Sequence, residues 1–338
     1  MTPSPDPQEP GAGESGRAES GPREPAPQEP GRASGVVHAR GVGYRYGDGP
    51  PALSEVDLDV GVGEIVALVG PPGSGKSTLV RLLAGELTPT SGSLELPARR
   101  TSAGRLMLGY APPAGPHLET LSGRDNAVFF ARAAGMKGSE AKLAVAELMG
   151  LLGLEADAHR AVADYDVGAR RRLLLVQALA HRPALTVLDE PFRQLVQSER
   201  EALIHILRVH SAKRGTVVVA SSELPLLPEL ADRIIFVHQG RIVRGGRVAE
   251  LLSSVGPATR IEIELERRPQ HLDARFRPGI TIVSQADPLV IETTRGQAAV
   301  GEVCSALNAA GAVIRSVTVR ETDLAEVFRR ATGAELQS

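Results

Sequence analysis

Gly70-Pro71-Pro72-Gly73-Ser74-Gly75-Lys76-Ser77-Thr78 decides the fold class of this 338-residue chain. The stretch fits G-x-x-x-x-G-K-[ST], a loop whose backbone N–H groups converge on phosphate oxygens. In such a loop Lys76 reaches the outer phosphates and the Ser77 hydroxyl holds Mg²⁺. The plain alternative is a glycine-rich turn with an accidental lysine, but the whole chain has only four lysines. We therefore expect Gly70 to Thr78 to bind the phosphates of a nucleotide.

The residues around this loop predict a buried strand before it and a helix after it. The uninterrupted apolar run 65–69 is typical of a parallel strand. Apolar residues at helical spacing from Leu79 to Leu83 predict a helix that ends near Gly85. Further strands are expected at 106–110, 185–189, 216–220, 233–238 and 241–243, with helices at 170–181 and 199–213. The alternation predicts an α/β fold with a parallel sheet and a mostly helical insert at about 111–168.

Composition and charge exclude several other classes. A formal net charge of −2 gives no general attraction to nucleic acid or to anionic membranes. A single cysteine, Cys304, excludes an internal disulfide framework, and we expect it to be a small core residue. No apolar run approaches the ~18 residues of a membrane span, and the N-terminus lacks the pattern of a signal peptide. These features favour an intracellular chain that meets the membrane only through a partner.

Composition also divides the chain into three parts. Residues 1–35 are rich in Pro, Gly, Glu and Ser and predict a disordered tail. Residues 36–256 are expected to form the nucleotide-binding domain, which begins with a β-rich stretch up to Val60. Residues 257–338 predict a small α+β accessory domain, because apolar and charged residues alternate at 261–266 and a last helix capped near Thr322 follows. This domain carries no phosphate-type loop and is expected to be accessory or dimerising.

A second motif contains the two carboxylates that such a nucleotide site needs. Leu185-Thr186-Val187-Leu188-Asp189-Glu190-Pro191 is an apolar strand that ends in Asp189 and Glu190. At a strand end Asp189 can hold Mg²⁺, and Glu190 can orient the attacking water or accept its proton. An Asp-Glu pair alone is more often a solvated turn, but the phosphate loop about 110 residues upstream favours the catalytic interpretation.

The order of these motifs resembles that of ABC-type ATPases, the nucleotide-binding subunits of ABC transporters. The resemblance covers about 36–250 and rests also on Gly63-Glu64, on Thr88-Pro89-Thr90-Ser91-Gly92 and on the helix around Arg171. It implies a P-loop NTPase core of ABC type, ATP and Mg²⁺ as cofactors, and Tyr46 as the aromatic residue that stacks on adenine. The ending Thr322-Asp323-Leu324-Ala325-Glu326-Val327-Phe328 is similar to the tail of daunorubicin-resistance-type exporter subunits.

Four features of that family are altered in this chain. Pro113 stands where the family has a glutamine that senses Mg²⁺ and water. Tyr165-Asp166-Val167-Gly168-Ala169 replaces the Leu-Ser-Gly-Gly-Gln signature, so Asp166 presents a carboxylate to a polyphosphate. Val196 replaces an aspartate, and Ser221-Ser222-Glu223-Leu224 contains no switch histidine. His238 lies a strand later and is expected to be a surface residue.

Two functions remain open at this point. The chain is either a divergent transporter ATPase, dimeric and docked on a separate membrane permease, or a catalytically weak cassette that binds ATP and needs a competent partner. The resemblance implies a second cassette, in a homodimer or heterodimer, at the cytoplasmic face of the membrane. Soluble ABC proteins of translation or DNA repair are disfavoured, because the chain has one cassette, no sustained heptads and no basic patch. A small GTPase is disfavoured because no Asn-Lys-x-Asp motif is present.

Overall fold

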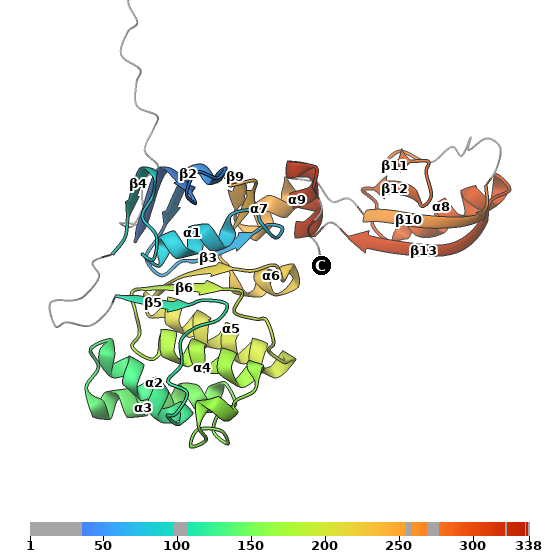
Figure 1. Ribbon diagram of the computed structural model, residues 1–338. Coiled ribbons are helices and arrows are strands. Elements are labelled where there is room, and N and C mark those ends of the chain that lie inside the picture. Colours follow the sequence, from blue (N-terminus) through green and yellow to red (C-terminus); the bar gives the residue numbers. More distant parts are fainter. Residues whose placement is uncertain are drawn as a thin grey trace, which may run out of the picture. The chain divides into compact units, whose positions relative to one another are not determined.

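The nucleotide-binding part of the chain is built on a six-stranded, mainly parallel sheet (Figure 1). The structure is a computed structural model that describes residues 36–97, 107–254, 259–268, 277–321, 323–334 and 336. The predicted tail 1–35 lies outside the described residues. The strand order is β5-β6-β7-β3-β8-β9, and only β9 runs antiparallel to its neighbour. The strands are β3 (Ile65–Val69), β5 (Leu108–Ala111), β6 (Leu185–Asp189), β7 (Thr216–Ala220), β8 (Arg233–His238) and β9 (Arg241–Gly246). The predicted parallel α/β core is confirmed.

The two faces of this sheet are covered differently. In β7, Val217 and Val219 pack into a core with the helical insert, whereas Val218 and Ala220 pack with the phosphate-loop helix. This period of two is the reason that both faces of an apolar strand can be buried. In Figure 1, α4 and α5 lie on one side of the sheet, with α2 and α3 beyond them. The helices of this part are α1 (Lys76–Leu83), α2 (Gly123–Ala133), α3 (Gly138–Leu151), α4 (Val167–Leu179), α5 (Gln197–Ala212), α6 (Leu227–Leu230) and α7 (Val248–Ser253), with 3₁₀ turns at Val162–Asp164 and Leu224–Leu226.

Two smaller antiparallel sheets complete the described structure. The first has the order β2-β1-β4 and is formed by β1 (Val37–Arg45), β2 (Pro51–Val60) and β4 (Ser91–Glu95). The second has the order β11-β12-β10-β13 and is formed by β10 (Thr259–Arg267), β11 (Ile280–Ser284), β12 (Leu289–Thr293) and β13 (Val313–Glu321). Helix α8 (Ala298–Ala309) packs on it, and Cys304 on that helix is half-buried rather than part of its core.

The last helix, α9 (Leu324–Thr332), differs from its predicted place in the accessory domain. Leu324, Val327 and Phe328 share a hydrophobic core with β3 and β8 of the nucleotide-binding part. The Phe328 ring meets Phe236 edge-to-face at 5.4 Å and His238 at 6.0 Å. His238 therefore ends β8, as expected of a strand-end residue, but it is half-buried beside this helix rather than on the surface. Asp323 caps the helix, because its carboxylate accepts from the Glu326 N–H at 2.9 Å.

Candidate functional site

The phosphate loop joins the buried end of β3 to the first turn of α1. Two of its glycines are required by close approach. A Cβ at Gly70 would lie 2.0 Å from the Val237 carbonyl oxygen, and one at Gly75 would lie 2.8 Å from the Ala52 carbonyl oxygen. Gly75 also has a φ of 105°, in the left-handed region that favours glycine. The loop curls as the sequence pattern predicts, with its N–H groups at the start of a helix.

Lys76 is buried inside this curl, with 7% of its surface exposed. Its Nζ donates to the Gly70 carbonyl at 2.6 Å and to the Pro71 carbonyl at 3.1 Å. Burial lowers the pKa of Lys76, and the nearby carboxylates of Glu190 and Asp189 act against that shift. The ammonium group is thus held in place by backbone oxygens that a phosphate can replace as partners.

Ser77 and Asp189 meet across the space between the loop and β6. Asp189 ends β6 with 2% of its surface exposed, and the Ser77 hydroxyl hydrogen-bonds its carboxylate. Burial raises the pKa of Asp189, and the neighbouring Glu190 raises it further. Its Oδ1 has no hydrogen-bond partner among the described residues. A buried, unpartnered carboxylate oxygen beside a hydroxyl is a donor set that fits Mg²⁺.

This burial predicts that Asp189 lowers the stability of the nucleotide-free chain. Because its native pKa is raised, stability should fall as pH rises from the ordinary aspartate pKa through the native one. Asp189→Asn removes the charge and keeps an oxygen for the Ser77 hydroxyl, so its unfolding temperature should exceed that of wild type at neutral pH by about 2–4 °C. Calorimetry without nucleotide, with the exposed Asp48→Asn as control, measures this. An equal or lower unfolding temperature for Asp189→Asn would contradict the prediction.

Glu190 follows Asp189 in a left-handed backbone conformation, with a φ of 49°. Its N–H donates to the Ala220 carbonyl at 2.8 Å. Its carboxylate Oε2 accepts from the N–H of Ser222 at 3.1 Å and from the Ser222 hydroxyl at 3.2 Å. Ser222 thus lies after the end of β7, in the segment where the switch histidine was expected, and it fixes the side chain of Glu190. Sequence reasoning recorded the missing histidine but did not anticipate this contact.

Arg171 is a second residue of the site whose role the sequence did not reveal. It lies on α4 with 4% of its surface exposed. Its guanidinium donates to the backbone carbonyl of Asp189 at 2.6 Å and to that of Pro112. Burial lowers the pKa of Arg171 to about 10, although Asp189 and Glu190 act in the other direction. Arg171 therefore ties the ends of β5 and β6 together behind the carboxylates.

The altered signature segment begins a helix in this structure. Asp166 is the N-cap of α4, and its Oδ1 accepts from the Ala169 N–H at 2.7 Å. Val167 is 62% exposed and Val196 is 61% exposed. A Cβ at Gly168 would lie 3.2 Å from the Gln194 carbonyl oxygen, so the segments around 168 and 194 are neighbours. Two altered motifs thus lie next to each other, and the valines of both are exposed.

Tyr46, the residue expected to stack on adenine, lies beside the first turn of α1. The residue is 46% exposed, and its ring meets the Tyr44 ring edge-to-face with the ring centroids 4.8 Å apart. Its hydroxyl lies 3.3 Å from the Thr78 Oγ1 and accepts from Arg81 at 3.2 Å. These contacts hold the ring next to the phosphate loop with a surface left open.

Comparison with known proteins agrees with this geometry. Residues 53–193 match the family model described as ABC transporter. A daunorubicin resistance ATP-binding protein, DrrA3 of Streptomyces coeruleorubidus, is 32% identical over 86% of this chain and 93% of its own length. The chain belongs to the ABC transporter ATP-binding family. The iron(III) import ATP-binding protein FbpC of Streptomyces avermitilis is 39% identical, over 61% of each chain.

Solved structures show the same ABC ATPase fold. An ATP-binding subunit of an ABC transporter superposes with a TM-score of 0.59 at 22% identity, over 65% of this chain and 93% of its own. The dimeric ATP-binding cassette MJ0796, bound to ADP and Pi, superposes with a TM-score of 0.55 at 22% identity, over 62% of this chain and 98% of its own. Within the described ranges, no helix of this ABC ATPase is long and apolar enough to cross a membrane.

Proposed function

We propose that this chain is the ATP-binding subunit of an exporter, and that it hydrolyses ATP to drive a separate membrane permease. The observation that carries the proposal is the convergence of Lys76, Ser77, Asp189 and Glu190 from two distant segments at the carboxyl edge of the sheet. Ligands of open α/β sheets bind at this edge. A separate permease is proposed because the chain belongs to the ABC transporter ATP-binding family.

Each residue receives a defined role in this proposal. The loop from Gly70 to Thr78, which includes Pro71, Pro72, Gly73 and Ser74, binds the phosphates, and Lys76 contacts the outer ones. Tyr46 stacks on adenine. Ser77 and Asp189 hold Mg²⁺, which supplies charge neutralisation at the phosphates. Glu190, held by Ser222, orients the attacking water and accepts its proton.

Export is supported by how much of the chain is matched rather than by the percentage of identical residues. The daunorubicin resistance relative matches 86% of this chain, whereas the iron importer matches 61%. Only the longer match is wide enough to include much of the C-terminal region beyond the cassette. We propose accordingly that residues 36–256 form the cassette and that 257–338 form an accessory domain. The last helix of that domain packs against the cassette. The protein is proposed to work at the cytoplasmic face of the membrane.

The altered signature segment favours a second cassette of a different sequence. In a face-to-face dimer this segment caps the nucleotide of the partner subunit, and Asp166 would bring a carboxylate toward its phosphates. Two like charges ~4 Å apart repel by about 4 kcal/mol at an effective dielectric of 20. We propose a heterodimer in which the partner supplies an intact cap to the site built on Lys76, while this chain alone is weakly active.

A single substitution tests the contribution of Asp166. Asp166→Ser keeps an oxygen for the Ala169 N–H and removes the charge, so turnover by the isolated chain should rise by roughly tenfold. Asp166→Ala removes the cap as well and should lower the free energy of unfolding by about 1 kcal/mol. Phosphate release and chemical denaturation measure the two effects. If both variants turn over ATP at the wild-type rate, the carboxylate does not limit activity.

The proposed function itself is tested by Mg-ATP binding and phosphate release by the purified chain. Binding with turnover supports an energising subunit. Binding without turnover supports the second candidate, a regulatory cassette, which the altered residues Pro113, Asp166 and Val196 favour. Absence of binding, with the chain shown to be folded, would overturn both.

A further inference from the structure

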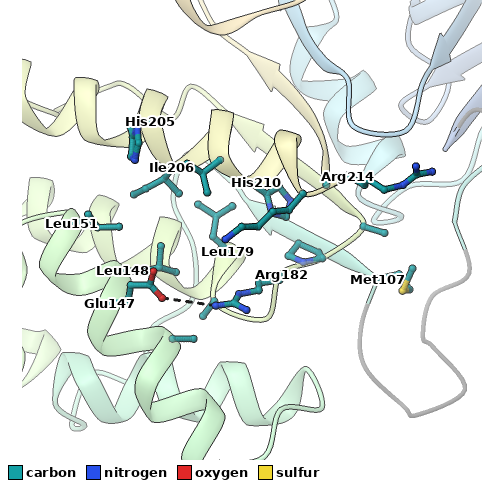
Figure 2. A pocket seen from close by; sticks show the side chains of 17 residues that line it. Met107, Glu147, Leu148, Leu151, Leu179, Arg182, His205, Ile206, His210 and Arg214 are labelled. Atoms are coloured by element: carbon teal, nitrogen blue, oxygen red, sulfur yellow. Dashed lines mark ion pairs between the residues drawn. The ribbon is translucent and has the colours of Figure 1, made fainter.

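A hollow of about 450 Å³ lies at the edge of the sheet opposite the nucleotide site (Figure 2). Its lining includes Met107, Ala184 and Gly215, which immediately precede β5, β6 and β7. The nucleotide-site residues follow the other ends of those parallel strands, about 16 Å away for strands of five residues. The hollow is therefore a separate site on the same three strands.

The floor and walls of the hollow are apolar. They come from α3 of the helical insert, from the end of α4 and from α5, and they include Leu148, Leu151, Leu179, Ile206 and Val209. Leu151 is 46% exposed and Val209 is 37% exposed, so apolar surface remains open to solvent here. The volume lies within the range of small-molecule pockets. The ring of His210 adds to the lining, and its Nε2 lies 3.2 Å from the Thr186 hydroxyl.

The rim of the hollow carries an excess of positive charge. Arg182, Lys213 and Arg214 line it, with Glu147 as the acidic residue among the lining side chains. The Glu147 carboxylate lies 3.8 Å from the Arg182 guanidinium. Among the described residues that line the hollow, no carboxylate is left to pair with Lys213 or Arg214. Within the described part of the chain, neither Lys213 nor Arg214 has an ion-pair partner. Figure 2 shows Arg182 and Glu147 joined across one side and Arg214 pointing away on the other.

Two arginines at this rim, Arg182 and Arg214, have left-handed backbone conformations. Arg182 has a φ of 51° and Arg214 a φ of 70°, in the left-handed region that favours glycine. Among the described residues, 14 glycines and six other residues have a positive φ, and Arg182 and Arg214 are two of those six. Both residues follow the ends of helices, α4 and α5, where a left-handed conformation is common, and these helix ends bring the two arginines to the rim of the hollow.

We propose that this hollow binds an amphipathic organic anion, with its apolar body against Leu148, Leu151, Ile206 and Val209 and its anionic group at Arg182 and Lys213. A carboxylate on an aliphatic or aromatic body satisfies both halves of the site. The bound anion contacts α3 of the helical insert together with the loops that lead into β6 and β7. It therefore joins the insert to the core at a distance from the nucleotide.

Decanoate is the probe, and decyltrimethylammonium, which carries the opposite charge on the same tail, is its matched control. Calorimetric titration of the full chain should give saturable binding of one decanoate, at least roughly tenfold tighter than that of the cation, and weaker in high salt. The Lys76→Ala variant should bind decanoate as wild type does, because the two sites lie at opposite edges of the sheet. Equal binding of both probes, or no saturable binding of decanoate, would overturn the proposal.

Two sets of variants separate the charged rim from the apolar wall. Arg182→Gly combined with Lys213→Gln removes the two cations proposed to bind the anion and relaxes the left-handed position at residue 182, so the fold should be kept while decanoate affinity falls by roughly tenfold or more. Leu151→Gln changes the wall, and Leu143→Gln changes a 74% exposed leucine on the same helix that does not line the hollow. Only Leu151→Gln should weaken binding. Unchanged affinity in the variant that lacks both cations, or equal effects of the two leucine variants, would refute the site.

Discussion

Lys76→Ala is expected to lower the affinity for Mg-ATP by roughly a hundredfold and to abolish measurable turnover. The Nζ of Lys76 lies inside the phosphate loop, held by the Gly70 and Pro71 carbonyls, and no other lysine or arginine contacts those two carbonyls within the described residues. Removing it leaves bound phosphate oxygens without their cation. Fluorescent nucleotide titration and phosphate release measure the two effects.

The Lys76→Ala variant should remain folded, so a loss of ATP binding can be assigned to the missing cation. Lys76 is a buried cation whose burial lowers its pKa, so its removal also removes a desolvation penalty. The unfolding temperature without nucleotide should therefore stay close to that of wild type. Lys137→Ala, at an exposed lysine before α3, is the matched control and should bind and turn over ATP normally. Normal ATP binding by folded Lys76→Ala would remove the central argument for the site.

Glu190→Gln is expected to keep ATP binding and to lower turnover by about 10²- to 10⁴-fold. The amide is nearly isosteric, and its oxygen can still accept from the N–H and hydroxyl of Ser222. It cannot accept a proton from the attacking water. The loss should therefore fall on kcat while nucleotide affinity changes little.

The control for this variant is another glutamate that does not meet the nucleotide. Glu201→Gln changes an exposed residue on α5 and should leave kcat unchanged. Turnover by Glu190→Gln at more than about a tenth of the wild-type rate would show that Glu190 is not the base. Loss of binding together with turnover would instead assign Glu190 a structural role at the left-handed turn after β6.

Much of the fold could be predicted because its signals are local. The phosphate loop needs a strand before it, glycines within it and a helix after it, and all three are written within residues 65–83. The apolar strand that ends in Asp189 and Glu190 is read in the same way. Backbone conformation and apolar runs depend on neighbouring residues, so sequence patterns reveal them. The ABC-type order of motifs followed from these segments.

The remaining features depend on contacts between distant segments, and no local pattern encodes them. Ser222 meets Glu190, and Arg171 meets the backbone of Asp189, only because β6, β7 and α4 are placed side by side. His238 is covered by Phe328, a residue 90 positions later in the numbering. The basic rim at Arg182 and Arg214 likewise forms where two loops come together at one edge of the sheet. The sequence by itself determined the phosphate loop, the carboxylate strand and the family; the tertiary structure decided which side chains fix the carboxylates and where the last helix packs, because those depend on three-dimensional proximity.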